Sequence, residues 1–262
     1  MGTGKGIETR GHLVGFKEEI DKIAKEDKDS FFTWFDSAEN TNVAFIRGQW
    51  DFMFHIARPL ARYISKPEKK IALEIGYGGG RILAAATCSF KKVIGVDIHN
   101  HKDLVAKELT NRGYSNFELK QGDGKSLSMS KSSIDVVYSF IVFQHIEKVE
   151  YFERYLKEVF RIVKKGGIAI LYFGRFAHFS VGKKLNILYL LDKYIEPFFL
   201  RKGFIELPSA VNDINLLISM KYAKKISRHI GFEVLDTLVS KKKVPDGCHY
   251  YGLQHAIILK RP

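Results

Sequence analysis

A series of short apolar runs in the middle of the chain constrains the fold more than any other feature of the sequence. The runs are predicted as strands at residues 71–75, 93–97, 116–120, 134–139 and 168–173. The segments 82–90, 103–112 and 151–163 have the length and apolar spacing of helices. Strands that alternate with helices of this length form a parallel sheet with right-handed crossover connections. The sequence therefore predicts an α/β fold with a doubly wound, mostly parallel sheet.

The chain continues beyond this series at both ends. Residues 1–66 have helical periodicity and many aromatic side chains, and they are predicted as an N-terminal helical extension or cap. Residues 67–262 form the predicted main domain, with an insert at about residues 175–211 after the fifth strand. This insert includes an aromatic-rich, helix-like stretch within residues 176–200. That stretch fits a substrate lid, a dimer contact and a membrane-surface element equally well.

Order resumes after the insert. A helix at about residues 212–229 and two strands at residues 232–239 and 253–260 are predicted. The two strands should pair as an antiparallel hairpin at one edge of the sheet, which then has seven strands.

The charge of the chain limits its partners. The 262 residues include 42 Lys and Arg against 29 Asp and Glu, which gives a formal net charge of +13. Such an excess suits an anionic substrate, a nucleic acid or an acidic membrane surface. The lysines lie in short, scattered runs, however, and such runs are more typical of solvated faces than of one binding surface.

Targeting and redox signals are weak. The most apolar stretch, residues 185–200, is too short and too charged to span a bilayer. The N-terminus lacks the apolar core of a signal peptide. Cys88 and Cys248 lie far apart, without the spacing of metal ligands or redox pairs. We therefore expect a cytoplasmic protein with reduced thiols and no transmembrane segment.

A glycine-rich segment follows the first predicted strand directly. Residues 74–80 read Glu-Ile-Gly-Tyr-Gly-Gly-Gly. Glycines at positions 76, 78 and 80 let the backbone turn tightly and approach a ligand, because no Cβ intervenes. A dinucleotide-binding fingerprint would place its third glycine at position 81, where the chain has Arg81. The segment predicts a ligand-binding turn that departs from that fingerprint.

Three further motifs follow the next strands. Asp97 ends the second predicted strand, where a carboxylate can accept both hydroxyl hydrogens of a ribose. Asp123 and Gly124 follow the third strand, although both are also common turn residues. The fourth strand leads into a loop that contains Phe140, Gln144 and His145, and Lys164-Lys165-Gly166-Gly167 precedes the fifth strand.

In this order and at these intervals, the motifs resemble those of the class I S-adenosylmethionine-dependent methyltransferases, over roughly residues 70–173. The resemblance is to the small-molecule members of the type 11 and type 25 groups. It implies a Rossmann-like fold, S-adenosylmethionine as cofactor and S-adenosylhomocysteine as product. The residues that it implies for cofactor binding are Glu74, Gly76, Tyr77, Gly78, Gly80, Asp97, Ile98, Asp123, Gly124, Phe140 and Gln144.

His145 is the candidate general base. It follows the fourth strand at the expected mouth of the site, and an imidazole titrates near neutral pH. The alternative is a histidine that packs on the cofactor or caps the next helix. The carboxylate and Asn constellation of metal-dependent members is not found, so no metal is expected.

Acceptor-binding residues should come from the extension and from the start of the insert. The candidates are Arg47, Trp50, Tyr172, Arg175 and His178, with Tyr250 and Tyr251 as weaker ones. Arg175 could pair with a phosphate or carboxylate. The simpler interpretation of each aromatic is that it packs the extension onto the sheet.

The resemblance implies methyl transfer to a small molecule, at an oxygen of a sugar or of a phosphorylated metabolite, and an anionic acceptor would suit the net charge. An RNA or protein methyltransferase is the second hypothesis, which the charge favours. The loop after the fourth strand lacks the Asn/Asp-Pro-Pro-aromatic motif of amino-group methylases, so nucleic acid is not the favoured partner. A catalytically silent cofactor-binding subunit is the third hypothesis, although the glycine motif is intact. Monomer and homodimer both remain open.

Overall fold

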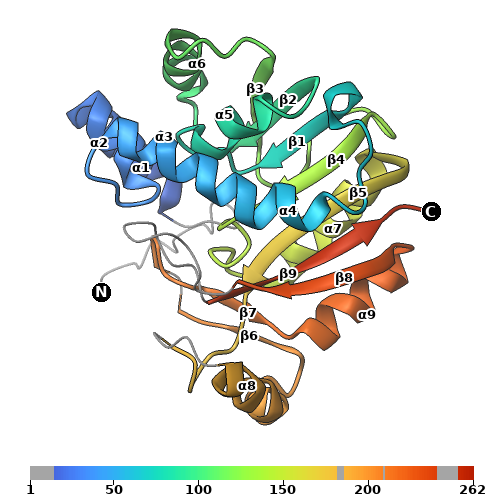
Figure 1. The fold of residues 1–262 in the computed structure, drawn as a ribbon. Helices are drawn as coiled ribbons and strands as arrows, with labels where there is room; N and C mark the ends of the chain where they lie inside the picture. Colours follow the sequence, from blue (N-terminus) through green and yellow to red (C-terminus); the bar gives the residue numbers. More distant parts are fainter. Residues whose placement is uncertain (1–14, 182–185, 209, 241–252) are drawn as a thin grey trace, which may run out of the picture.

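The computed structural model describes residues 15–181, 186–208, 210–240 and 253–262. Figure 1 shows a single twisted sheet with helices on both faces. Its parallel strands are β1 (Ile71–Ile75), β2 (Lys92–Asp97), β3 (Phe117–Gln121), β4 (Ile134–Ser139) and β5 (Val163–Gly174), in the order β3-β2-β1-β4-β5. The strand order reverses between β1 and β4, and ligands of open α/β sheets bind at such a switch point.

The antiparallel edge is formed by the last two strands. β9 (Gln254–Lys260) runs antiparallel along β5, and β8 (Glu233–Val239) runs antiparallel along β9. The predicted doubly wound sheet with a C-terminal hairpin is therefore confirmed. Its central strands are continuous apolar runs because helices cover both of their faces.

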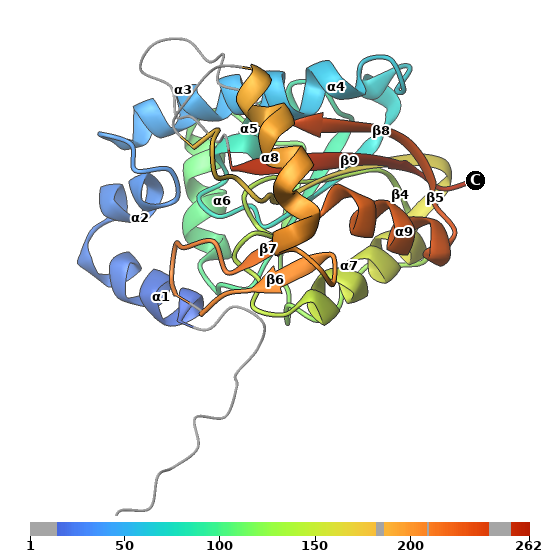
Figure 2. The same ribbon diagram turned by 90° about the horizontal axis from the view of Figure 1, so that it is seen from below.

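Two groups of helices form the outer layers (Figure 2). One face of the sheet packs against α5 (Arg81–Thr87), α6 (Lys102–Asn111) and the N-terminal helices in one hydrophobic core. The other face packs against α7 (Val149–Ile162) and α9 (Met220–Ile230) in a second core. Alternate residues of each strand point into the two cores, as Ala72 and Leu73 of β1 do.

The N-terminal helices lie on the first of these faces. They are α1 (Phe16–Glu26), α2 (Lys28–Trp34), α3 (Thr41–Asp51), the π-helix η1 (Phe52–Ala57) and α4 (Arg58–Leu60), followed by the 3-10 turn η2 (Pro67–Lys69). Side chains cap two of the starts, since Asp27 accepts from the Ser30 N–H at 2.9 Å and Asn40 accepts from the Val43 N–H at 3.0 Å. The division of the chain at residues 66 and 67 stays a prediction.

The insert contains more regular structure than the sequence predicted. α8 (Asn186–Phe199) is followed by β6 (Phe204–Glu206) and β7 (Leu216–Ile218), which pair with each other, and β7 also pairs with the end of β5 at Gly174. These two short strands raise the strand number from the predicted seven to nine. The predicted helix at 212–229 begins only at Met220, where the Ser219 side chain caps it. A short apolar run such as 214–218 fits a helix and a strand equally well by periodicity, and pairing with β5 and β6 decides it.

Candidate functional site

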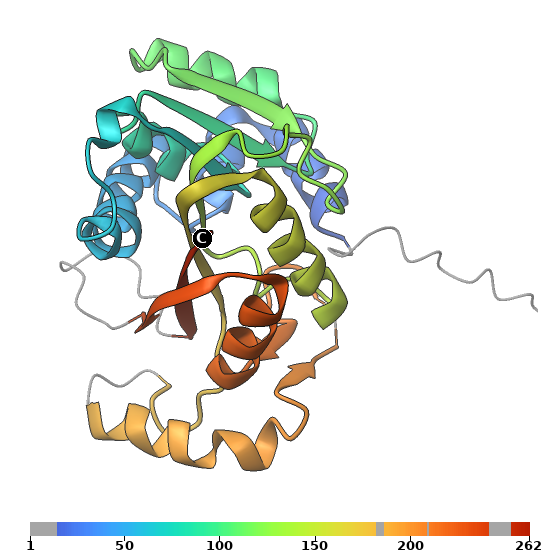
Figure 3. The same cartoon turned by 90° about the vertical axis from the view of Figure 1, so that its right-hand side faces the viewer.

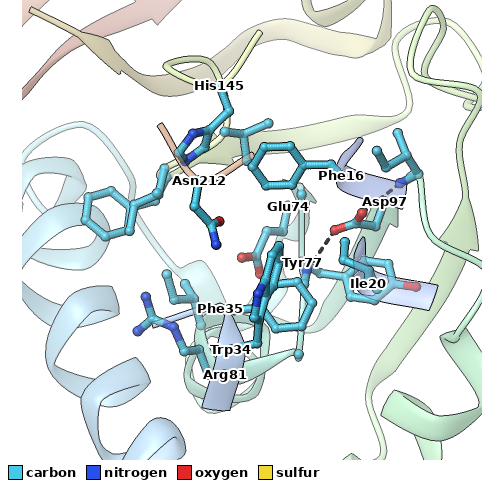
Figure 4. Close-up of a pocket in the computed structure, with 18 residues that line it drawn as sticks. Phe16, Ile20, Trp34, Phe35, Glu74, Tyr77, Arg81, Asp97, His145 and Asn212 are labelled. Atoms are coloured by element: carbon cyan, nitrogen blue, oxygen red, sulfur yellow. Dashed lines mark hydrogen bonds between the residues drawn. The ribbon is translucent and has the colours of Figure 1, made fainter. Parts of the chain in front are cut away.

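A hollow lies at the carboxyl ends of β1 and β4, at the switch point of the sheet. It encloses about 770 Å³ of space, including its open mouth. Strand ends form its floor and the N-terminal helices form its roof. The lining residues labelled in Figure 4 are Phe16, Ile20, Trp34, Phe35, Glu74, Tyr77, Arg81, Asp97, His145 and Asn212.

The glycine turn forms part of the floor. Gly76 and Gly80 have φ angles of +78° and +81°, which L side chains rarely adopt. A Cβ on Gly76 would lie 2.2 Å from Cγ2 of Val142, whereas one on Gly80 would meet Cγ1 of Val105 at 2.8 Å. Gly76 therefore keeps the hollow open toward the β4 loop. Gly80 does not line the hollow but lets α5 begin beside α6.

Asp97 joins the glycine turn to the end of β2. Its Oδ2 accepts a hydrogen bond from the Gly78 N–H at 2.8 Å, and its Oδ1 accepts one from the Ile98 N–H at 2.7 Å. Both oxygens belong to a carboxylate that lines the hollow. Oδ2 keeps a further lone pair, whereas Oδ1 also accepts a long hydrogen bond from the His99 N–H at 3.4 Å. Oδ2 can therefore accept a hydrogen from a ligand directly, and a second ligand hydrogen at Oδ1 would replace the long His99 contact. Ile98 and Tyr77 line the same wall.

A smaller hollow continues beyond Asp97. Gly76, Asp97 and Ile98 line both hollows, and Gly124 lines only the smaller one. The Asp123 side chain does not line it, because its Oδ1 accepts from the N–H groups of Lys125 and Ser126, both at 2.8 Å. The hydrogen bond from the Ser126 N–H is the main cause that lowers the pKa of Asp123. The backbone at Gly124, more than the Asp123 carboxylate, is thus placed to meet a ligand.

His145 lies at the mouth, opposite the glycine turn. Its Nδ1 is 2.6 Å from the carbonyl oxygen of Asp213. A carbonyl can only accept, so Nδ1 carries the proton and Nε2 carries the lone pair. The Gln144 amide nitrogen lies 3.2 Å from that Nε2, so Gln144 contacts His145 and does not itself line the hollow. Burial lowers the pKa of His145, so the ring is a neutral imidazole at neutral pH.

Buried charges lie beneath the floor. Burial raises the pKa of Glu74 to about 8, and the Tyr138 hydroxyl donates to its Oε2 at 3.0 Å. Arg81 donates to Asp51, and its Nε is 3.9 Å from Oδ2 of Asp36. Figure 4 shows Glu74 between His145 on one side and Arg81 on the other. Of these groups, only Glu74 and Arg81 line the hollow, whereas Asp36 and Asp51 pair with Arg81 and do not line it.

Tyr172 does not line the hollow itself but packs behind Phe140, which does. The Phe140 ring lines the hollow, the His55 ring stacks on it at 4.4 Å between centroids, and the Tyr172 ring meets its edge at 5.0 Å. The Tyr172 hydroxyl donates to the carbonyl of His55 at 2.9 Å. Burial, aided by Arg81, lowers the pKa of His55 to about 4.

The other acceptor candidates lie away from the hollow. Arg47 pairs with Glu39 at 2.9 Å, and Trp50 stacks on Phe54 with centroids 5.7 Å apart. Arg175 lines a second hollow beneath α8, where it donates to Ser180 at 2.6 Å and lies 3.4 Å from Asp192.

His178 lies beside that second hollow, and its backbone N–H donates to Asp192 at 2.9 Å. Tyr250 and Tyr251 lie outside the described residues. The structure therefore does not bring the acceptor candidates together, and their role stays a prediction.

Several lining residues were not predicted. Phe16, Ile20, Trp34 and Phe35 of the roof come from α1, α2 and the residue after α2, and Asn212 comes from the segment that follows the insert. The cluster of aromatics at residues 31–35 was the one available signal, and it equally fits core packing. Among the described residues, no group of three or more His, Cys, Asp or Glu side chains could hold a metal ion.

The strands and loops that build this site match a known protein family. Residues 73–171, from β1 to β5, match the family described as a methyltransferase domain. This match supports the predicted resemblance to the class I S-adenosylmethionine-dependent methyltransferases for that part of the chain. No curated protein sequence matches the chain.

Solved structures share the methyltransferase fold at low sequence identity. A SAM-dependent methyltransferase from Methanosarcina mazei is 22% identical with a TM-score of 0.54, and the match covers 78% of this chain and 96% of that one. A putative methyltransferase bound to the Haloferax volcanii Trm112 activator is 16% identical with a TM-score of 0.53, covering 82% and 93%. The [4+2]-cyclase SpnF is 14% identical with a TM-score of 0.55, covering 86% and 84%. These likenesses concern the fold alone.

Proposed function

We propose that this methyltransferase-fold chain binds S-adenosylmethionine in the hollow at the switch point and transfers its methyl group to an oxygen of a small-molecule acceptor. The observation that carries the proposal is Asp97, whose carboxylate is fixed by the Gly78 and Ile98 amides while it lines the hollow. The free lone pair of Oδ2, together with Oδ1 once the long His99 contact is given up, fits the adjacent hydroxyls of a ribose.

The remaining parts of the hollow fit the same cofactor. The smaller hollow, with Gly124 at its wall, would hold the flat base on the far side of Asp97. The Glu74 carboxyl lines the hollow, where its oxygens could accept a hydrogen bond from the amino group of the cofactor. The Gly76 turn lets the chain pass close to the ligand, since no Cβ fits there.

His145 is the proposed base. When bound, the cofactor supplies a methyl carbon that is already activated by its positive sulfur, and transfer to a hydroxyl leaves S-adenosylhomocysteine and one proton. His145 holds its own proton at Nδ1 on Asp213, so its Nε2 lone pair is the atom that would take the acceptor proton. The Gln144 amide, which faces the same nitrogen, would have to turn away from it.

Calorimetry tests the binding step. Titration of S-adenosylmethionine and S-adenosylhomocysteine into the wild-type chain should give heat, and titration of NAD should give none. Asp97→Asn should weaken both interactions. Absence of heat with both compounds, on folded protein, would contradict the proposal.

Methyl transfer needs its own test, because the relative SpnF is named as a cyclase and shares the fold. The measurement is formation of S-adenosylhomocysteine with hydroxylated metabolites, each offered with and without its phosphate or carboxylate. The net charge of +13 supports the anionic forms. Turnover that is unchanged after every anionic group is removed would count against an anionic acceptor. Steeply salt-dependent binding of RNA would favour a nucleic-acid methyltransferase instead.

The role of His145 is separable from binding. In single-turnover experiments, His145→Ala should slow methyl transfer while cofactor affinity stays the same. A rate within about threefold of wild type would remove His145 from catalysis.

A further inference from the structure

α8 has its polar side chains turned toward the protein. The side chain of Asp192 is 1% exposed and accepts from the backbone N–H groups of Phe179 at 2.7 Å and Ser180 at 3.1 Å. Glu196, one turn further on, lines the second hollow together with Arg175, and burial raises the pKa of Glu196 to about 7. Both acidic residues of this helix therefore serve inward contacts.

The opposite side of α8 is apolar and faces solvent. Five of its large side chains keep between two fifths and three quarters of their surface exposed: Ile187 58%, Leu190 61%, Leu191 41%, Tyr194 76% and Phe198 70%. Phe199 lies on the side of Asp192, where its ring stacks on Phe176 at 4.8 Å between centroids. Steps of three and four residues place Ile187, Leu190 and Leu191, Tyr194 and Phe198 on one stripe. α8 is the lowest helix in Figure 3, at the periphery of the molecule. A surface helix of a globular protein ordinarily has the reverse arrangement.

Positive charges border this stripe. Lys193 of α8 is exposed, and it lies between the stripe and the second hollow, which Lys221 and Lys224 of α9 also line. Arg201 and Lys202 follow the helix and are exposed as well. Within the described part of α8, the outward side carries no carboxylate, because Asp192 and Glu196 point inward.

We propose that the apolar stripe of α8 docks on the surface of a membrane that contains anionic phospholipids, with the helix lying in the plane of the interface. An apolar stripe with bordering lysines provides the two attractions that stable interfacial binding needs. A second copy of this chain fits less well, since it would bring the same lysines together on molecules that each carry a net charge of +13. No described helix is long and apolar enough to cross the bilayer, so the contact is with the surface only. This inference does not depend on methyl transfer.

Flotation of the full chain with vesicles tests it. The wild type should float with vesicles of phosphatidylcholine and phosphatidylglycerol and much less with phosphatidylcholine alone. Leu190→Ser combined with Phe198→Ser should weaken that binding at least about tenfold, since two large side chains no longer enter the interface. Both positions are exposed, and an unchanged thermal melting profile confirms that the variant is folded.

The chain offers a matched control. Ile46 and Met53, on α3 and η1, are 59% and 54% exposed. Ile46→Ser combined with Met53→Ser removes comparable apolar surface elsewhere and should leave vesicle binding unchanged. Lys193→Gln with Lys221→Gln should reduce binding to anionic vesicles only.

Three outcomes would overturn the proposal. The first is a wild-type protein that does not float with anionic vesicles. The second is an equal loss of vesicle binding in the α8 variant and in its control. The third is a dimer in sedimentation velocity that only the α8 variant abolishes, which would assign the stripe to a second copy. None of these outcomes affects cofactor binding, which calorimetry measures separately.

Discussion

The floor and the roof of the main hollow are built in different ways. The floor consists of strand ends, where the Gly76 turn and Asp97 are fixed by backbone hydrogen bonds and by a sheet that is buried on both faces. The roof consists of rings from the N-terminal helices, where Phe16, Trp34 and Phe35 pack on one another edge to face. The floor thus defines positions for polar ligand atoms, whereas the roof supplies apolar cover with fewer directional constraints. We expect cofactor recognition to depend on the floor and acceptor recognition to depend on the roof.

The largest expected effect comes from filling the glycine turn. Gly76→Ala should lower the free energy of unfolding by roughly 2–4 kcal/mol, because strain at positive φ adds to the clash with Val142. Gly113 has a φ of +87°, and no atom lies within 4 Å of the place that a Cβ would take, so Gly113→Ala should cost only the strain, about 1 kcal/mol. Urea unfolding measures both. Equal losses in the two variants would mean that the floor is not tightly packed at Gly76.

Asp97→Asn is expected to come second. Loss of the charge at this position should weaken S-adenosylmethionine binding by roughly 10- to 100-fold, since hydrogen bonds to charged groups contribute about 1.5–3 kcal/mol each. Asp123→Asn is the control, because that side chain closes its own loop and does not line the hollow. Calorimetry should show its affinity within about threefold of wild type. An equal loss of affinity in Asp123→Asn would indicate that the cofactor lies nearer the loop after β3 than proposed.

The protonation of Glu74 gives a pH-dependent effect that is smaller within any one pH unit. Burial raises its pKa from an ordinary value of 4.5 to about 8. The protonated carboxyl therefore favours the folded state fully below pH 4.5, and this stabilisation is lost as the pH rises through 8. Glu74→Gln should flatten the decline of stability between pH 5 and 8 by on the order of 1 kcal/mol per pH unit.

Glu118→Gln provides the comparison for this pH profile. A hydrogen bond from Lys92 lowers the pKa of Glu118, so that residue titrates below the window. Thermal melts across the pH range should show the wild-type slope for this variant. A wild-type slope for Glu74→Gln as well would mean that Glu74 is ionised in the folded protein.

The smallest effect on cofactor binding is expected in the roof. Trp34→Ala should change the affinity for S-adenosylmethionine by less than about threefold, since an apolar ring contributes no directed contact to its polar groups. The KM for the acceptor should rise instead, and steady-state kinetics would separate the two constants. A large loss of cofactor affinity with an unchanged acceptor KM would reverse the proposed division between floor and roof.

The sequence predicts the floor well and the roof poorly, for physical reasons. β1, β2 and β4 are buried on both faces, so their residues form continuous apolar runs, and the turn after β1 needs glycine. Phe16 and Asn212 reach the hollow only through tertiary packing, which leaves no local pattern. Periodicity also cannot separate a three-residue strand such as β7 from the start of a helix.

Arg175 and His178 were expected to bind the acceptor, but the path of the chain after β5 takes them away from the main hollow. Both follow β5, and ligands bind at the carboxyl ends of parallel strands. β5, however, stays paired with β9 as far as Gly174, and Arg175 then donates its N–H to Leu253 at 3.0 Å. The chain therefore leaves the sheet beside β9 and passes toward α8, not over the ends of β1 and β4.

The segment that follows the insert contacts the mouth of the hollow. The segment that follows α8 and β6 supplies both the Asp213 carbonyl, which holds the Nδ1 proton of His145, and the Asn215 side chain, which donates to the His145 carbonyl at 2.9 Å. The tautomer of the imidazole is thus set by backbone and side-chain groups of the short segment that precedes β7. A rearrangement of residues 213–215 would therefore free Nδ1 and change which ring nitrogen carries the proton, and the nitrogen chemical shifts of His145 would report it.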